Sequence, residues 1–268
     1  MIWKCRDKEL EYGKRVLIMG IVNITPDSFS DGGKWFNPNS AVERSLSLIA
    51  DGADIIDLGA QSTRPNYSEV DEIEEWQRLK PVLKKLREIT DKPISVDTYF
   101  PFVAKNALEA GADIINDVSG EMNPLIAKEV SSCGAGWVVM HNGEGSVNEV
   151  KDFFDYAVSE AEKLGVKKEQ LCLDMGIGFG KSYEENLELI SNVEKYKKDG
   201  LPLLIAFSRK RVIGKASGQD IPEKRIWGNI AADTAAVLGG ADIIRVHEVK
   251  GEIEGIRTAE ELKRVWIK

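Results

Sequence analysis

The stretch Ala-Gly-Ala-Asp-Ile-Ile at residues 110–115 recurs in near-identical form elsewhere in the chain. Its two relatives are Asp-Gly-Ala-Asp-Ile-Ile at residues 51–56 and Gly-Gly-Ala-Asp-Ile-Ile at residues 239–244. Glycine commonly ends a helix, and paired isoleucines favour a strand. Each phrase is therefore interpreted as a helix that turns directly into a strand. The repetition is a structural signal and does not by itself indicate an activity.

Short apolar runs and longer amphipathic runs alternate around these phrases over nearly the whole chain. Strands are predicted at residues 16–23, 55–59, 94–97, 114–118, 136–141, 171–174, 203–207 and 243–247. Helices are predicted at residues 41–50, 72–89, 102–110, 125–132, 147–164, 184–197, 223–238 and 259–266.

Strands that are apolar throughout are typical of a parallel sheet covered by helices, which makes this an α/β protein. Eight strand and helix pairs favour a closed (β/α)8 TIM barrel. No linker-like segment divides the chain, so residues 1–268 are interpreted as a single barrel domain. A doubly wound open sheet is the alternative, and the regular count of repeats argues against it.

The composition is that of an acidic globular protein. The chain has 268 residues, of which 43% are hydrophobic, and a formal net charge of -8. This charge argues against nucleic acid and anionic membranes as general partners. There is no apolar run of about 18 residues and no signal-like start, so a cytoplasmic location is expected. Cys5, Cys133 and Cys172 are odd in number and far apart, which excludes a disulfide framework or a paired-cysteine metal site.

Polar residues follow every predicted strand, and in a barrel the carboxyl ends of the strands meet at one mouth. The set comprises Asn23, residues 61–66, Asp97, Asn116, Asp117, His141, Asp174, residues 208–210, Arg245 and His247. Taken singly, such residues are as often turn or core residues, and residues 209–211 can be a solvated charge run. The glycines of residues 176–180 do not have dinucleotide-binding spacing and can simply form a tight loop. Their joint placement on one face is what points to a site.

The strand-end residues divide into two chemical groups. Asp97, Asn116 and Asp174 can bind the edge of a flat heterocycle such as a pterin or purine, with Lys210 donating to a ring carbonyl or nitrogen. The second group, which suits a phosphate or pyrophosphate, comprises Asn23, Arg64, Arg245 and His247. Together the groups predict one small-molecule substrate that carries both a ring and an anion.

The loop after the first barrel strand reads Asn-Ile-Thr-Pro-Asp-Ser-Phe-Ser-Asp-Gly-Gly at residues 23–33. Proline fixes one backbone angle, and the two glycines permit angles that other residues avoid. The polar side chains suit a polyanion, and the aspartates can face an accompanying cation. The alternative is a turn that caps the next helix.

These motifs resemble those of the dihydropteroate synthases, a pterin-binding barrel family of the folate pathway. The resemblance rests on residues 23–33, 62–65, 95–98, 115–120, 176–181, 208–210 and 245–247. It implies a transferase that condenses 6-hydroxymethyl-7,8-dihydropterin pyrophosphate with 4-aminobenzoate to give 7,8-dihydropteroate and pyrophosphate. It also implies Mg2+ as cofactor, a homodimer and competition by sulfonamides. A dissociative, SN1-like substitution is our hypothesis for the chemistry.

The resemblance also implies a role for each site residue. The pterin would be held by Asp97, Asn116, Asp174 and Lys210, and the pyrophosphate by Asn23, Arg64, Arg245 and His247. The metal ligands would be Asn23 and, as a further candidate, Asp31. The aminobenzoate pocket would include Phe29, Thr63, Pro65 and Arg211. The catalytic set would be Asn23, Arg64, Lys210, Arg245 and His247.

Five positions differ from the residues that are usual in the family. These are Gln61, Asn66, Tyr99, Met175 and Ala206, where Glu, Gly, Arg, Pro and Gly are common. They flank the strand ends, so they put pocket shape, drug affinity and loop dynamics in doubt more than the reaction.

Three rival functions remain open at this point. A related pterin-binding barrel passes a methyl group from a methylated folate to a corrinoid protein, but it needs no pyrophosphate site. A non-catalytic pterin-binding paralogue is harder to separate by sequence. A metal-dependent hydrolase is disfavoured because the chain has only two histidines, on different strands, and no His-x-His pair.

Overall fold

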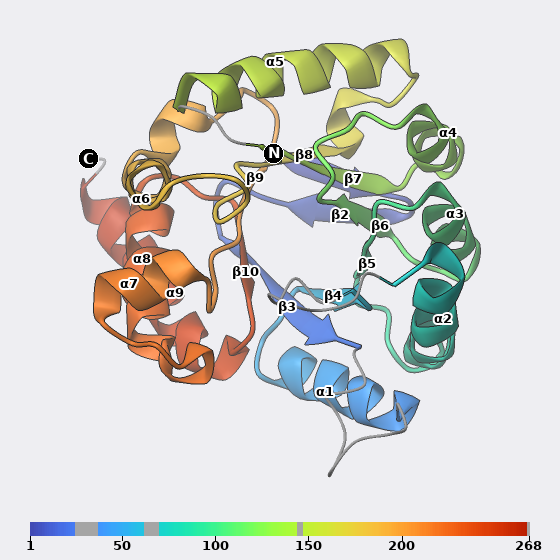
Figure 1. The fold of residues 1–268 in the computed structure, drawn as a ribbon, viewed down its shortest axis with the longest axis horizontal. Coiled ribbons are helices and arrows are strands. Elements are labelled where there is room, and N and C mark those ends of the chain that lie inside the picture. The colour runs from blue at the N-terminus through green and yellow to red at the C-terminus, as the bar shows by residue number, and fades with distance from the viewer. Residues whose placement is uncertain (25–36, 62–69, 144–146, 267–268) are drawn as a thin grey trace.

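The computed structural model describes residues 1–24, 37–61, 70–143 and 147–266. Within them, eight parallel strands close into a barrel in the order β10-β3-β4-β5-β6-β7-β8-β9, with helices around the outside (Figure 1). The strands are β3 (Leu17–Asn23), β4 (Ile55–Gly59), β5 (Ile94–Asp97), β6 (Ile114–Asp117), β7 (Gly136–Met140), β8 (Leu171–Asp174), β9 (Leu203–Ile205) and β10 (Ile243–Val246). The predicted (β/α)8 barrel is confirmed.

The helices follow the strands in the predicted alternation. They are α1 (Pro38–Ala50), α2 (Glu72–Ile89), α3 (Pro101–Glu109), α4 (Pro124–Cys133), α5 (Val147–Lys163), α6 (Tyr183–Ser191), α7 (Arg211–Ser217), α8 (Ile226–Leu238) and α9 (Val249–Trp266). Short 3-10 turns are η1 (Lys168–Gln170), η2 (Val193–Tyr196) and η3 (Pro222–Lys224). None of the described helices is both long enough and apolar enough to cross a membrane.

The helices differ from the prediction most at three places. The helix expected at residues 184–197 ends at Ser191, and η2 follows it. Helix α7 was not predicted, because its seven residues are too few to display a helical period. Helix α9 begins at Val249 rather than Ala259. Its glycines look like helix breakers in the sequence, but Gly255 lies where a Cβ would come within 2.7 Å of Ile230 in α8, so it permits close helix packing.

An N-terminal hairpin that the sequence did not predict covers the amino-terminal end of the barrel. Strands β1 (Ile2–Cys5) and β2 (Lys8–Glu11) pair antiparallel, and Trp3, Cys5 and Tyr12 are buried against the first residues of the barrel strands. The Trp3 indole N–H donates to the carbonyl of Gln170 at 2.8 Å. The strands are too short and too polar to stand out by pattern alone, because only one face is buried.

The aspartate of the repeated phrase makes the same contact in all three copies. It precedes one strand and accepts a hydrogen bond from the backbone N–H of the strand before it. The bonds run from Ile18 to Asp54 at 3.0 Å, from Ile94 to Asp113 at 2.9 Å and from Leu203 to Asp242 at 3.0 Å. Each carboxylate also pairs with a basic side chain: Arg15, Arg87 and Lys197 respectively. The repeat thus fastens adjacent strands to one another, which is a structural role.

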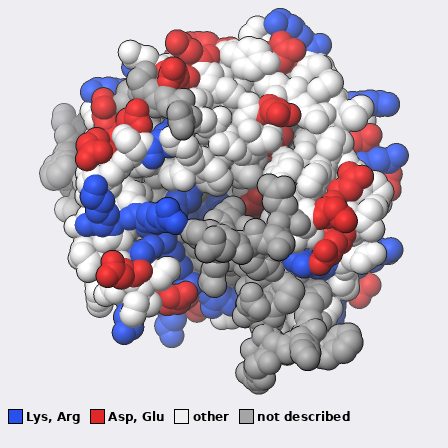
Figure 2. Space-filling model, in the orientation of Figure 1, with Lys and Arg blue, Asp and Glu red and all other residues white. Residues whose placement is uncertain are grey.

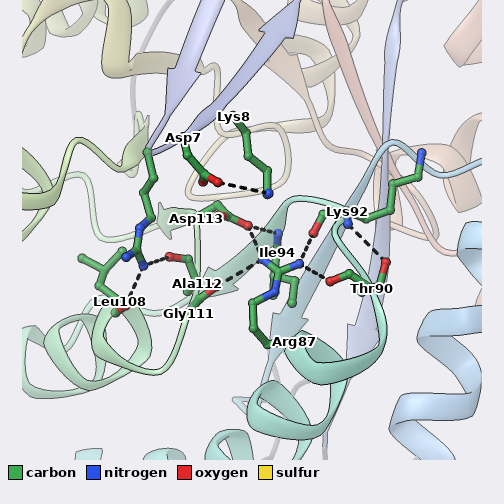
Figure 3. A network of polar contacts seen from close by, with 11 residues as sticks. Asp7, Lys8, Arg87, Thr90, Lys92, Ile94, Leu108, Gly111, Ala112 and Asp113 are labelled. Atoms are coloured by element: carbon green, nitrogen blue, oxygen red, sulfur yellow. Dashed lines mark hydrogen bonds and ion pairs between the residues drawn. The ribbon is translucent and has the colours of Figure 1, made fainter.

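Figure 3 shows this contact at Asp113. Arg87, in the last turn of α2, donates from Nη1 to Asp113 Oδ2 at 2.9 Å and from Nη2 to the carbonyl of Lys92 at 2.7 Å. Burial raises the pKa of Asp113 even though the Ile94 N–H and the Arg87 guanidinium act to lower it. The Asp113 carboxylate therefore stabilises the fold mainly by accepting hydrogen bonds from these donors, and less through net charge attraction.

The substitution Asp113→Asn is expected to lower the free energy of unfolding by about 2 kcal/mol. Arg87 Nη1 and the Ile94 N–H both donate to Oδ2, so the amide oxygen can still accept them, but the negative charge that strengthens both hydrogen bonds is lost. Urea denaturation followed by circular dichroism would measure the change. Asp91→Asn is the matched control, because Asp91 is exposed and its replacement should change the value by less than about 0.5 kcal/mol. Equal effects of the two substitutions would contradict the proposed fastening role.

Candidate active site

Residues at the carboxyl ends of neighbouring strands form the candidate site. Asp97 ends β5 and lies in register with Asn116 of β6, while Asp174 ends β8 and Arg245 lies in β10. Asn116 and Asp174 are almost fully buried. Parallel strands in register present their carboxyl ends at one edge of the barrel, so these residues lie at the same mouth.

Arg245 is the centre of the polar contacts. Its Nε donates to Asp57 Oδ2 at 2.7 Å, and its Nη2 donates to Asp97 Oδ2 at 2.7 Å. Asn116 Nδ2 also donates to Asp57 Oδ2, at 3.3 Å. Burial raises the pKa of Asp97, and the nearby Arg245 acts against that rise. The structure thus joins Arg245, assigned by sequence to the anion group, directly to Asp97 and, through Asp57, to Asn116, both of which were assigned to the ring-binding group.

Asp57 belongs to this cluster and was missed in the sequence. Its side chain is fully buried in the middle of β4. The available signal was a single charged residue inside the apolar run Ile-Ile-Asp-Leu-Gly at residues 55–59. Because a buried carboxylate needs a partner, that position was a candidate for a buried ion pair.

The loop after β8 is held by two lysine side chains. Lys210 Nζ donates to the carbonyl of Ile177 and lies 4.4 Å from the centre of the Phe179 ring. Lys181 Nζ donates to the carbonyls of His141, Gly176 and Phe179 at 3.2, 3.0 and 3.2 Å. Burial lowers the pKa of each lysine to about 8.

Two glycines give this loop its shape. Gly176 has φ 66°, and a Cβ on it would come within 1.8 Å of the carbonyl oxygen of His141. Gly178 has φ 83°, and a Cβ there would lie 2.8 Å from the stem of Lys210. The tight-loop interpretation of these glycines is therefore correct, and the absence of a Cβ at Gly178 leaves room for the Lys210 stem. Asp174 Oδ1 accepts the Gly176 N–H at 2.8 Å.

His247 lies just beyond β10, surrounded by basic groups. Its Nδ1 is 3.1 Å from Ser208 Oγ, and its carbonyl accepts from Arg44 at 2.6 Å. Burial, together with Arg209, Arg245 and the other cations nearby, holds the pKa of His247 well below its usual value. The imidazole is therefore neutral at physiological pH.

The remaining predicted residues are only partly described. Asn23 ends β3 half-buried, in register with Gly59, and Arg211 is exposed at the start of α7. Five predicted site residues lie outside the described part of the chain: Phe29, Asp31, Thr63, Arg64 and Pro65. Gln61 is one of the five residues that differ from those usual in the family. It donates to the Val70 carbonyl at 3.1 Å and to the Tyr99 hydroxyl at 3.3 Å.

The surface around the site differs in charge from the chain as a whole. The formal net charge is -8, yet Figure 2 shows Lys and Arg side chains gathered left of centre, over the region where Figure 1 places α7. Such a local positive area attracts anions. Within the described residues there is no group of three or more His, Cys, Asp or Glu side chains that could hold a metal ion by itself.

Comparison with known proteins connects this geometry to a family. A family model described as "Pterin binding enzyme" matches residues 19–247. The dihydropteroate synthase of Synechocystis sp. is 41% identical over 267 residues, which cover 95% of this chain and 92% of the relative. The dihydropteroate synthase of Clostridium beijerinckii is 41% identical over 264 residues, covering 96% and 97%.

Solved structures agree. The dihydropteroate synthase of Clostridium difficile, crystallised in the presence of pteroic acid, superposes with a TM-score of 0.89 at 42% identity, covering 94% of this chain and 98% of that one. The Xanthomonas albilineans dihydropteroate synthase with 4-aminobenzoic acid has a TM-score of 0.92 at 36% identity, covering 98% and 99%. The resemblance inferred from the sequence motifs is confirmed. The chain belongs to the pterin-binding enzyme family and, within it, to the dihydropteroate synthases, which are transferases.

Proposed function

We propose that this enzyme condenses 6-hydroxymethyl-7,8-dihydropterin pyrophosphate with 4-aminobenzoate to give 7,8-dihydropteroate and pyrophosphate. The observation that carries the proposal is the cluster of Asp97, Asn116, Asp174 and Lys210 beside Arg245 at one barrel mouth. Relatives solved with pteroic acid, with 4-aminobenzoic acid and with 7,8-dihydropteroate support the choice of substrates.

The pterin would lie against the carboxylates and the amide. Burial raises the pKa of Asp97 and of Asp174, which means that each carboxylate lacks the hydration that it would have in water. Ring N–H and amino groups would supply donors to these oxygens, while Asn116 can both donate and accept. Lys210 would donate to a ring carbonyl or nitrogen.

The pyrophosphate would be bound by Asn23, Arg64, Arg245 and His247. Asp57 and Asp97 engage Nε and Nη2 of Arg245, so its plane is fixed before any anion arrives. Among the contacts made by the described residues, Nη1 is left for an anion. A fixed guanidinium stabilises developing negative charge without the cost of reorganising during the reaction.

Mg2+ is part of the proposal. The Asn23 amide oxygen is a hard donor at the strand end, and Asp31 is the further candidate ligand. One or two protein oxygens fit Mg2+, because this ion keeps several waters and is commonly held together with substrate phosphates. When bound, it would neutralise charge on the pyrophosphate.

The chemistry would be a dissociative substitution. The C–O bond breaks, pyrophosphate leaves with the electron pair, and the pterin ring delocalises the positive charge on its methylene carbon. The amine of 4-aminobenzoate then attacks that carbon and loses a proton. Arg245 and His247 would stabilise the leaving group. Phe29, Thr63, Pro65 and Arg211 would form the aminobenzoate pocket, where sulfonamides would compete.

A homodimer, which the family resemblance implies, is also proposed. The Trp227 side chain at the start of α8 is 79% exposed. A large aromatic side chain in this position is typical of a surface that a partner covers.

The test is to incubate the protein with the pterin pyrophosphate, 4-aminobenzoate and Mg2+, and to measure dihydropteroate and pyrophosphate. We expect the two products in equal amounts. Folded protein that binds the pterin pyrophosphate but forms no product would instead favour the binding-only paralogue. A parallel reaction without 4-aminobenzoate tests the mechanism: a burst of pyrophosphate supports the dissociative route, and no release contradicts it.

A further inference from the structure

Two buried carboxyl groups lie between α8 and α9, outside the cluster that contacts the substrate. Asp233 of α8 and Glu252 of α9 are 1% and 0% exposed. Asp233 Oδ2 and Glu252 Oε2 have no hydrogen-bond partner within the described part of the chain. Burial raises the pKa of both groups, and the nearby Glu252 charge raises that of Asp233 further. Two like charges cannot both persist in such a place, so the pair retains at least one proton at neutral pH.

This acid pair is connected to His247 through Asn229 and Ser208. Asn229 Nδ2 donates to Glu252 Oε1 at 2.9 Å and lies 3.4 Å from Ser208 Oγ. The Ser208 hydroxyl also faces Glu252 closely enough to lower the pKa of that carboxyl. On its other side, Ser208 Oγ is 3.1 Å from His247 Nδ1. A continuous polar path therefore runs from the acid pair to the imidazole.

The hydrogen-bonding capacity of Ser208 fixes the direction of this path. Its oxygen accepts the backbone N–H of His247 at 3.2 Å and the amide N–H of Asn229 at 3.4 Å. A hydroxyl has two acceptor sites and one donor proton, so both acceptor sites are filled. The proton must then be donated, and Nδ1 is the acceptor at hydrogen-bond distance. An Nδ1 that accepts carries no proton, so the neutral imidazole carries its proton on Nε2.

We propose that Glu252 and Asp233 form a proton-holding pair that keeps His247 in its Nε2–H tautomer through Asn229 and Ser208. While Glu252 holds its proton, it does not compete for the hydroxyl proton of Ser208. If Glu252 ionises, its carboxylate attracts that proton and also holds the Asn229 amide more strongly, which frees an acceptor site on Ser208. The imidazole proton then moves to Nδ1, and Nδ1–H donates to that site. Glu252 and Asp233 are thus positioning residues that act through Ser208.

The consequence for the reaction rests on the proposed function. An Nε2–H group can donate to an oxygen of the departing pyrophosphate, whereas a bare Nε2 would repel it. The pH dependence follows from the charged groups around each end of the path. Glu252 faces Asp233, Glu248 and Arg209, and His247 faces Arg44, Arg209, Arg245 and Lys210. The cations keep His247 neutral, so a rise in pH changes the tautomer and not the charge of the ring.

Nitrogen-15 NMR of the full chain labelled at histidine tests the proposal directly. The chain has only two histidines, and His141→Gln assigns the spectrum. At about pH 6 we expect an unprotonated Nδ1 and a protonated Nε2 for His247, with a shift towards Nδ1–H as the pH rises to about 9. In Glu252→Gln the Nε2–H tautomer should persist over the whole range. An Nδ1–H tautomer or a doubly protonated ring at the lower pH would overturn the proposal, as would a Glu252→Gln spectrum that titrates like the wild type.

A second variant keeps the proposal testable if Glu252→Gln does not fold. Ser208→Ala removes the hydroxyl that joins Glu252 to His247, so the tautomer of His247 should no longer change as Glu252 ionises. A Ser208→Ala spectrum that changes with pH like that of the wild type would contradict the path.

Activity provides an independent readout. In Glu252→Gln, kcat should no longer fall above neutral pH, while KM for the pterin pyrophosphate should change less than about 3-fold. If the spectra behave as expected but no dihydropteroate forms, the tautomer proposal stands and the proposed function fails. If dihydropteroate forms but His247 has the opposite tautomer, the proposed function stands and the tautomer proposal fails.

Discussion

The substitution Arg245→Met is expected to lower kcat/KM for dihydropteroate formation about 10³-fold, because it removes the guanidinium that we propose stabilises the leaving group. It should also lower the free energy of unfolding by about 3 kcal/mol, since it removes the partner of the fully buried Asp57 carboxylate and of the half-buried Asp97 carboxylate. Asp57 is fully buried, and Asp97 is raised in pKa by burial even with Arg245 beside it. Steady-state kinetics and urea denaturation would measure the two effects.

A double variant separates the two effects of this change. Asp57→Asn combined with Arg245→Met removes the carboxylate that the single variant leaves unpaired. The double variant should recover much of the lost stability and none of the lost activity. Recovery of both would mean that Arg245 acts only as a structural partner of Asp57. Arg245→Lys is a further control: it keeps a charge but cannot reach Asp57 and Asp97 at once, so it should also be strongly impaired.

This prediction replaces the simpler division that the sequence suggested. By sequence, Arg245 belonged with the anion-binding residues and Asp97 with the ring-binding residues. In the structure the two side chains are 2.7 Å apart, so loss of Arg245 should affect pterin affinity as well as pyrophosphate handling. Chemical type alone assigned each residue to a ligand, but it contained no information on which residues contact one another.

The fold was readable from the sequence because its signals are local. Apolar runs, amphipathic helices and the repeated Gly-Ala-Asp-Ile-Ile phrase each depend on residues close together in the chain. The elements that were missed depend on distant contacts. The N-terminal hairpin forms against the ends of the barrel strands, and α9 continues through Gly251 and Gly255 because α8 packs closely there.

The site was readable to the extent that topology alone determines it. The strand-end rule brings Asp97, Asn116 and Asp174 together in any barrel of this register. It has no means of finding Asp57, which lies inside a strand, or Glu252, which acts from a helix behind His247. Pairing between buried charges depends on three-dimensional distances that no short motif contains. The roles given to residues 29, 31 and 63–65 remain predictions.

Lys210→Met is expected to weaken binding of the pterin pyrophosphate about 10²-fold at neutral pH, because it removes the ammonium that we propose donates to the ring. In the wild type, burial lowers the pKa of Lys210 to about 8, although Asp174 acts to raise it. The charged form is therefore present below about pH 8 and is lost as the pH rises through that value. Binding should weaken over the same range, and isothermal titration calorimetry at several pH values would measure it.

Two lysines can give this pH dependence, because burial also lowers the pKa of Lys181 to about 8. Arginine stays charged throughout this range, so it distinguishes them. Lys210→Arg should remove the fall in affinity above about pH 8, whereas Lys181→Arg should leave it in place. The reason is that the Lys181 ammonium already donates to three carbonyls of the loop, so it positions the loop and does not face the ligand. The opposite result would transfer the ligand-binding role to Lys181 and would mean that Lys210 serves to hold Ile177 and Phe179 in place.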